Sequence, residues 1–91
     1  MSIDKRVIKE QLSLPAVVSF YTGQPIPRDG FILCPFHNDH NPSMKIYNDH
    51  YKCYSIGCDH HGDVIQWVEE WEQVDFQTAL QICNELLLNS H

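Results

Sequence analysis

One segment, residues 34 to 58, constrains what this chain can fold into more than any other. It holds three of the four cysteines and three of the six histidines in the 91-residue sequence. Cys34 and His37 are separated by two residues, Cys53 and Cys58 by four, and fifteen residues lie between the two pairs. Core packing does not require such spacing, so we expect a fold that brings the two pairs together.

The spacing of the two pairs is typical of a structural zinc site, in which paired cysteines and histidines are about two to four residues apart. Three thiolates and one imidazole complete a closed tetrahedron, which stabilises a fold and leaves no position for an activated water. Because an unfolded chain offers no preformed site, metal binding should contribute directly to folding. We therefore predict that Cys34, His37, Cys53 and Cys58 hold one zinc ion.

The cellular compartment bears on the alternative of disulfide bonds. The sequence has no apolar run of the roughly 20 residues that a membrane span requires. Its charged N-terminus, MSIDKRVIKEQL, lacks the apolar core of a signal peptide. We therefore expect a cytoplasmic protein with reduced thiols, in which clustered cysteines bind metal rather than form disulfides.

The sequence leaves individual ligands open. His40, His60 and His61 lie close to the two pairs, and Cys58 with His60 offers an alternative pair. Cys83 is different, because it falls on an apolar helical stripe and is best explained as a small core residue.

The charge distribution is uneven. The net charge of -6 disfavours a nucleic-acid binder, yet all six lysines and arginines lie at or before position 52. Up to Cys53 there are six basic and five acidic residues, whereas from Tyr54 onward there are seven acidic residues and no lysine or arginine. We expect two surfaces of opposite character, which the average conceals.

Helical and strand patterns alternate along the first half of the chain. Residues 3–12 predict a short helix, and Ser13 can cap a second helix that ends near Gly23. Short strands are predicted at residues 31–34, 43–47 and 50–54.

The second half is predicted to be helical after Gly62. Asp63 with Gln66 resembles a capping box for a helix. Its expected apolar positions are Val64, Ile65, Val68 and Trp71. A last helix should start at Asp75, with inward positions at Phe76, Ala79, Leu80, Cys83 and Leu87. We expect both helices to pack over the sheet, giving an α+β fold in which residues 1–91 form a single domain.

A turn at Asn48 and Asp49 would set the register of the hairpin. Lys45 would then face Lys52, and Met44 would face Cys53 on the inner side. A slip of one residue would invert the two faces. The outer face is expected to carry Lys45, Tyr47, His50, Lys52 and Tyr54.

Three stretches, CPFHNDHNPSMKI, YKCYSIGCDHHGDVIQWV and DFQTALQI, resemble the N-terminal zinc-binding domain of bacterial and phage-type DNA primases. The resemblance covers nearly the whole chain. It implies a zinc ribbon, in which helices flank a small antiparallel sheet and Cys34, His37, Cys53 and Cys58 are the zinc ligands. In that family the domain helps to engage single-stranded template DNA during primer initiation, and a separate polymerase domain synthesises the primer.

Two features depart from the family pattern. The second pair is spaced C-x4-C rather than the usual C-x2-C, so its turn should bulge. Glycines common after that pair are replaced by Asp59, His60 and His61. Residues 1–91 contain no polymerase domain, so we expect no catalytic activity from them alone, although the resemblance implies a role within a primase, which is a nucleotidyltransferase.

The resemblance also suggests a use for the outer hairpin face. Single-stranded DNA is held by cations along its phosphates and by aromatic rings beneath its bases. The candidate contacts are Lys45, Tyr47, His50, Lys52, Tyr54 and Arg28. The expected partners are single-stranded DNA and a polymerase domain or another replication protein, such as a helicase or primase component. The alternative is a stand-alone structural zinc module that mediates protein contacts on a phage or mobile element.

Overall fold

The computed structural model describes residues 4–37 and 41–89. In this part of the chain four helices accompany one antiparallel sheet with the strand order β1-β2-β3-β4. The helices are α1 (Lys5–Gln11), α2 (Leu14–Thr22), α3 (Val64–Glu72) and α4 (Phe76–Asn89). The strands are β1 (Phe31–Ile32), β2 (Met44–Ile46), β3 (Tyr51–Cys53) and β4 (His61–Gly62). The predicted α+β class is confirmed.

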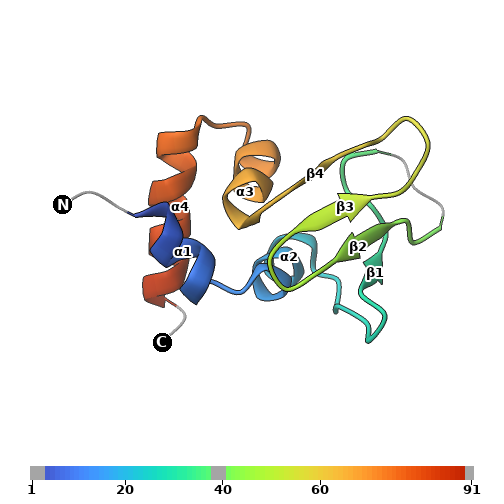
Figure 1. Cartoon of the computed structure of the whole chain (residues 1–91), viewed down its shortest axis with the longest axis horizontal. Coiled ribbons are helices and arrows are strands. Elements are labelled where there is room, and N and C mark those ends of the chain that lie inside the picture. Colours follow the sequence, from blue (N-terminus) through green and yellow to red (C-terminus); the bar gives the residue numbers. More distant parts are fainter. Residues whose placement is uncertain (1–3, 38–40, 90–91) are drawn as a thin grey trace.

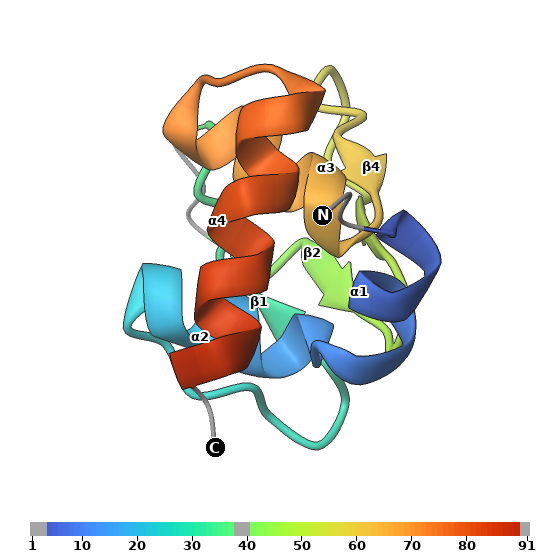
Figure 2. The same ribbon diagram turned by 90° about the vertical axis from the view of Figure 1, so that its left-hand side faces the viewer.

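The helices and the sheet occupy different ends of the molecule (Figure 1). Helices α1 and α4 lie at one end, the sheet lies at the other, and α2 and α3 stand between them. Seen from the helical end, α4 crosses in front of the other elements (Figure 2). Helix α4 packs against α3 and α1. The expectation that both C-terminal helices cover the sheet is therefore wrong for α4, since α3 lies between α4 and the strands.

The helix boundaries follow from the caps predicted in the sequence. The Ser13 hydroxyl accepts a hydrogen bond from the Ala16 N–H at 3.3 Å, and α2 ends at Gly23 with φ of 71°. Asp63 caps α3 by accepting from the Gln66 N–H at 2.9 Å. Asp75 does the same for α4, through the Thr78 N–H at 2.8 Å.

The predicted hairpin register is the observed one. Met44 pairs with Cys53, Lys45 with Lys52, and Ile46 with Tyr51. The inner residues of both strands are buried, whereas the outer positions are partly or fully exposed. Strand β4 was not predicted, because its two residues, His61 and Gly62, carry no alternating pattern of their own.

The core joins the helices to the inner face of the sheet. Its centre is Trp67 of α3, which is fully buried and packs edge-on against Tyr51 with ring centroids 5.2 Å apart. The predicted apolar positions of α3 omitted Trp67, although it lies three residues after Val64, and included Trp71, which is only partly buried. Phe76 was also assigned to the core, but it is 39% exposed at the first position of α4. The other inward positions predicted for α4 are buried: Ala79, Leu80, Cys83 and Leu87.

Candidate metal centre

The two ligand pairs meet at the end of the sheet farthest from α4. Cys34 and His37 lie in the turn that follows β1, while Cys53 ends β3 and Cys58 lies in the loop before β4. One nitrogen of His37 and the three sulfurs all lie within 4.8 Å of one another. No other group of three or more potential ligands comes together in residues 4–37 and 41–89.

The spacing of these atoms fits a tetrahedral zinc ion. With zinc–sulfur bonds of about 2.3 Å, two sulfurs on a tetrahedron are about 3.8 Å apart. The sulfurs of Cys34 and Cys58 are 3.5 Å apart. All four cysteines are free of disulfides. Three sulfurs and one imidazole are also the donor set that zinc prefers over calcium or magnesium. When bound, the ion would supply a structural cross-link, since four protein ligands leave no open position.

Backbone groups are arranged to support negative charge on the sulfurs. Each cysteine of the group accepts a hydrogen bond from the backbone N–H two residues later, in Phe36, Ser55 and His60. Burial nevertheless raises the pKa of the Cys34 thiol far above its ordinary value. A buried thiol of this kind becomes a thiolate when a divalent cation stabilises the negative charge.

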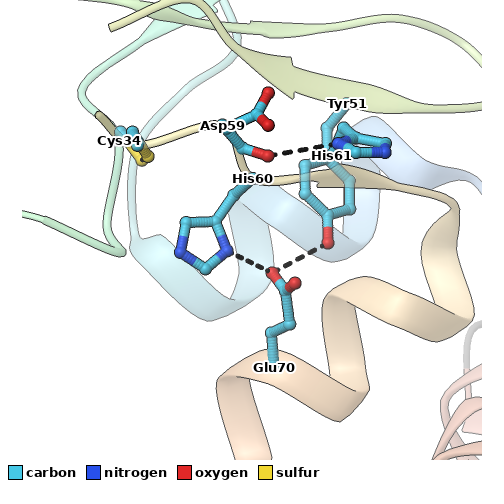
Figure 3. Close-up of polar contacts among 7 residues, drawn as sticks. Cys34, Tyr51, Asp59, His60, His61 and Glu70 are labelled. Carbon is cyan, nitrogen blue, oxygen red and sulfur yellow. Dashed lines mark hydrogen bonds and ion pairs between the residues drawn. The ribbon is translucent and has the colours of Figure 1, made fainter. Parts of the chain in front are cut away.

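The competing histidines make other contacts. Nδ1 of His60 lies 3.1 Å from Oε2 of Glu70, and the same oxygen accepts the hydroxyl of Tyr51 at 3.0 Å (Figure 3). Nδ1 of His61 lies 3.1 Å from the carbonyl oxygen of Asp59. Neither histidine belongs to the metal-ligand group found among the described residues. His40, the third competitor, lies outside the described residues.

Cys83 takes no part in the centre. Its side chain is fully buried on α4, as predicted for a core residue. Burial, together with the charge of Asp63, raises the pKa of the Cys83 thiol to about 12.

The outer hairpin face brings five of the six predicted contacts for DNA together. The rings of Tyr47 and His50 are stacked with centroids 4.1 Å apart and an angle of 10°. The Tyr47 hydroxyl lies 2.8 Å from that of Tyr54. Lys45 Nζ lies 5.2 Å from the centre of the Tyr47 ring, and Lys52 Nζ lies 5.1 Å from that of Tyr54.

The face also differs from the prediction at its edge. Phe31 of β1 is paired with Lys45, whose Nζ lies 5.5 Å from the Phe31 ring. Residues 31–34 are all apolar, so no alternation marks Phe31 as an outer residue, and no sequence pattern indicates the register between this strand and the hairpin. Arg28 lies in the exposed turn that leads into β1, and its contribution to the face stays a prediction.

Comparison with known proteins places the chain in a family. A family model described as a CHC2 zinc finger matches residues 3–90. The chain belongs to this family. It is therefore a primase-type zinc-binding domain, and one structural zinc ion is its cofactor.

Relatives of this CHC2 zinc finger include DNA primases. The chain is 35% identical over 75 residues to the DNA primase of Thermotoga maritima, covering 81% of this chain and 13% of that protein. It is 36% identical over 77 residues to the DNA primase of Mycoplasma pneumoniae, covering 80% of this chain and 12% of that one. The chain thus spans only a small part of the relatives it matches.

A solved structure supports the same fold. The Aquifex aeolicus primase, in a crystal structure of its zinc binding and RNA polymerase domains, matches 96% of this chain with a TM-score of 0.80 and 26% identity. The match covers 22% of the Aquifex chain. Among the residues that the structure describes, no helix has the length and apolar character needed to cross a bilayer.

Proposed function

We propose that this chain is the zinc-stabilised DNA-binding module of a primase system and contacts single-stranded template during primer initiation. Its ligand set would be Cys34, His37, Cys53 and Cys58, the group whose atoms converge within 4.8 Å. The ion would fix the two turns beside the hairpin and thereby hold the outer face in one shape.

The observation that carries the DNA proposal is the pairing of two lysines across the hairpin. Lys45 and Lys52 are direct cross-strand partners, and like charges in that position weaken a sheet. Phosphates bound beside them would relieve this repulsion. Aromatic rings flank both lysines, as needed to stack unpaired bases: the ring of Tyr47 beside Lys45 is partly exposed, and that of Tyr54 beside Lys52 is exposed. The acidic residues Glu69, Glu70 and Glu72 of α3 would repel the phosphates of single-stranded DNA and thereby favour its binding to the outer hairpin face.

The partner proposed for this module is a polymerase domain, because the Aquifex primase contains both kinds of domain. The thiolates of the zinc centre require a reducing compartment, for which we propose the cytoplasm. We therefore propose that the chain acts in DNA replication.

Binding to labelled oligonucleotides tests the proposal directly. Fluorescence anisotropy at low salt should show tighter binding to single-stranded DNA than to a duplex of the same sequence. Equal affinity for the single-stranded and duplex forms would contradict the proposal that the module recognises unpaired template bases. Capture of a protein partner with no DNA binding would instead favour a structural module for protein contacts.

A further inference from the structure

The loop between the last two cysteines has an exposed tip. Ile56 at the tip is fully exposed to solvent. Gly57 and Asp59 have φ angles of 88° and 53°, in the left-handed region that glycine adopts freely and that aspartate adopts more often than most residues. Ile56 therefore adds no packing that would hold the tip of the loop. Cys58 itself donates its N–H to the Ser55 carbonyl at 3.2 Å and packs against the core, and the segment that returns to β4 supplies further contacts.

His60 lies at the base of this loop and contacts both cysteines through its backbone. Its carbonyl oxygen accepts a hydrogen bond from the N–H of Cys53 at 2.8 Å. Its own N–H donates to the sulfur of Cys58. A displacement of His60 would therefore move the backbone around both sulfurs of the second pair.

The side chain of His60 connects this residue to two other parts of the molecule. Its Nδ1 lies 3.1 Å from Oε2 of Glu70 on α3, and Tyr51 of β3 donates its hydroxyl to the same oxygen (Figure 3). Its ring lies on that of Phe36, with centroids 4.8 Å apart and an angle of 32°. Phe36 belongs to the turn of the first ligand pair. His60 thus links both ligand turns to α3.

We propose that His60, held by Glu70, is a positioning residue of the zinc site that keeps the Cys58 turn in its ligating geometry. The proposal rests on the ligand set given above and goes beyond it, because neither side chain is itself a ligand. It also accounts for the long C-x4-C turn, whose exposed tip is compensated by an anchor at its base. Residues outside the ligand set that orient ligands typically change metal affinity by about 10- to 100-fold.

The chain offers matched controls for both residues. His61 is adjacent to His60, but its Nδ1 lies 3.1 Å from the carbonyl oxygen of Asp59 in the same loop instead of reaching α3. Glu72 lies on the same helix as Glu70 and also accepts a tyrosine hydroxyl at 3.0 Å, from Tyr21. Substitution of Glu72 therefore removes an equivalent contact on α3 without touching a ligand turn.

The test measures the rate at which purified, zinc-loaded protein releases its metal to a chromogenic chelator. His60→Ala and Glu70→Leu should each release zinc about tenfold faster than the wild type. His61→Ala and Glu72→Leu should stay within about twofold of it. Glu70→Gln keeps an oxygen acceptor and should restore most of the slow release. Equal rates for His60→Ala and His61→Ala would overturn the proposal.

Zinc content and release rate together distinguish a failure of this inference from a failure of the proposed ligand set. Elemental analysis of the wild type should first give one zinc per chain, and its absence would refute the ligand set. If zinc is present and only the rates are unchanged, the positioning role alone fails. If Glu70→Leu does not fold, His60→Ala decides, since it leaves the bond between Tyr51 and Glu70 in place.

Discussion

The variant Lys45→Ala/Lys52→Ala removes both lysines of the hairpin and tests whether this face binds DNA. The expected change is in the salt dependence of DNA affinity, and its size follows from the number of lysines removed. Each lysine can neutralise one phosphate, and each phosphate contact on a single strand contributes about -0.7 to the slope of log affinity against log salt. Two contacts therefore account for a slope of about -1.4, which corresponds to a loss of about sevenfold in affinity between 50 and 200 mM salt. The double variant should lose this part of the salt dependence.

The assay is fluorescence anisotropy of a labelled oligonucleotide titrated at several salt concentrations. A matched control, Lys5→Ala/Arg6→Ala, removes two charges from α1, which lies at the end of the molecule opposite the sheet (Figure 1). This control should keep the wild-type slope. The hairpin variant should be no less stable than the wild type, because it relieves the repulsion between opposed lysines. An unchanged slope in the hairpin variant, or an equal change in the control, would refute the reasoning.

Two further predictions concern the core. Trp67→Ala removes a fully buried ring that contacts Tyr51 and Phe36, and it should lower the free energy of unfolding by about 3–5 kcal/mol in chemical denaturation of the zinc-loaded protein; a loss below about 1 kcal/mol would contradict this role. Cys83 gives a pH dependence, since its pKa of about 12 in the folded state lies above the ordinary value of 9.0. The unfolded chain releases this proton first, so stability should fall as pH rises from 9 towards 12, by up to about 1.4 kcal/mol per pH unit. Denaturation of Cys83→Ala should show a shallower decline, and an identical pH profile would exclude this contribution.

The hairpin was predictable because two independent patterns agreed. Alternation of side chains placed Met44 and Ile46 on one face, and a two-residue turn fixed the partner of each. The convergence of Cys34, His37, Cys53 and Cys58 could be predicted because the spacing within each pair matches the local turns that hold zinc ligands. Caps at Ser13, Asp63 and Asp75 likewise act within one helical turn.

Some features that sequence reasoning missed depend on contacts between distant segments. Trp67 lies three residues after Val64, on the stripe that the helical period defines, so this core position could have been predicted and was omitted. Its contact with the ring of Phe36, thirty-one positions earlier, could not be predicted from the period of α3. The bond between His60 and Glu70 arises because a long turn ends beside α3. Phe76 failed as a core prediction because it is the first residue of α4, where its side chain is 39% exposed.

The coupling between zinc and the fold is the central claim, and removing the metal from the protein tests it most directly. Thermal unfolding followed by near-ultraviolet circular dichroism should be cooperative for the zinc-loaded chain. After equilibration with a strong chelator, the aromatic signal from the cluster around Trp67 should collapse, and it should return when one equivalent of zinc is added. A metal-free chain that keeps the same spectrum and the same melting temperature would contradict the account.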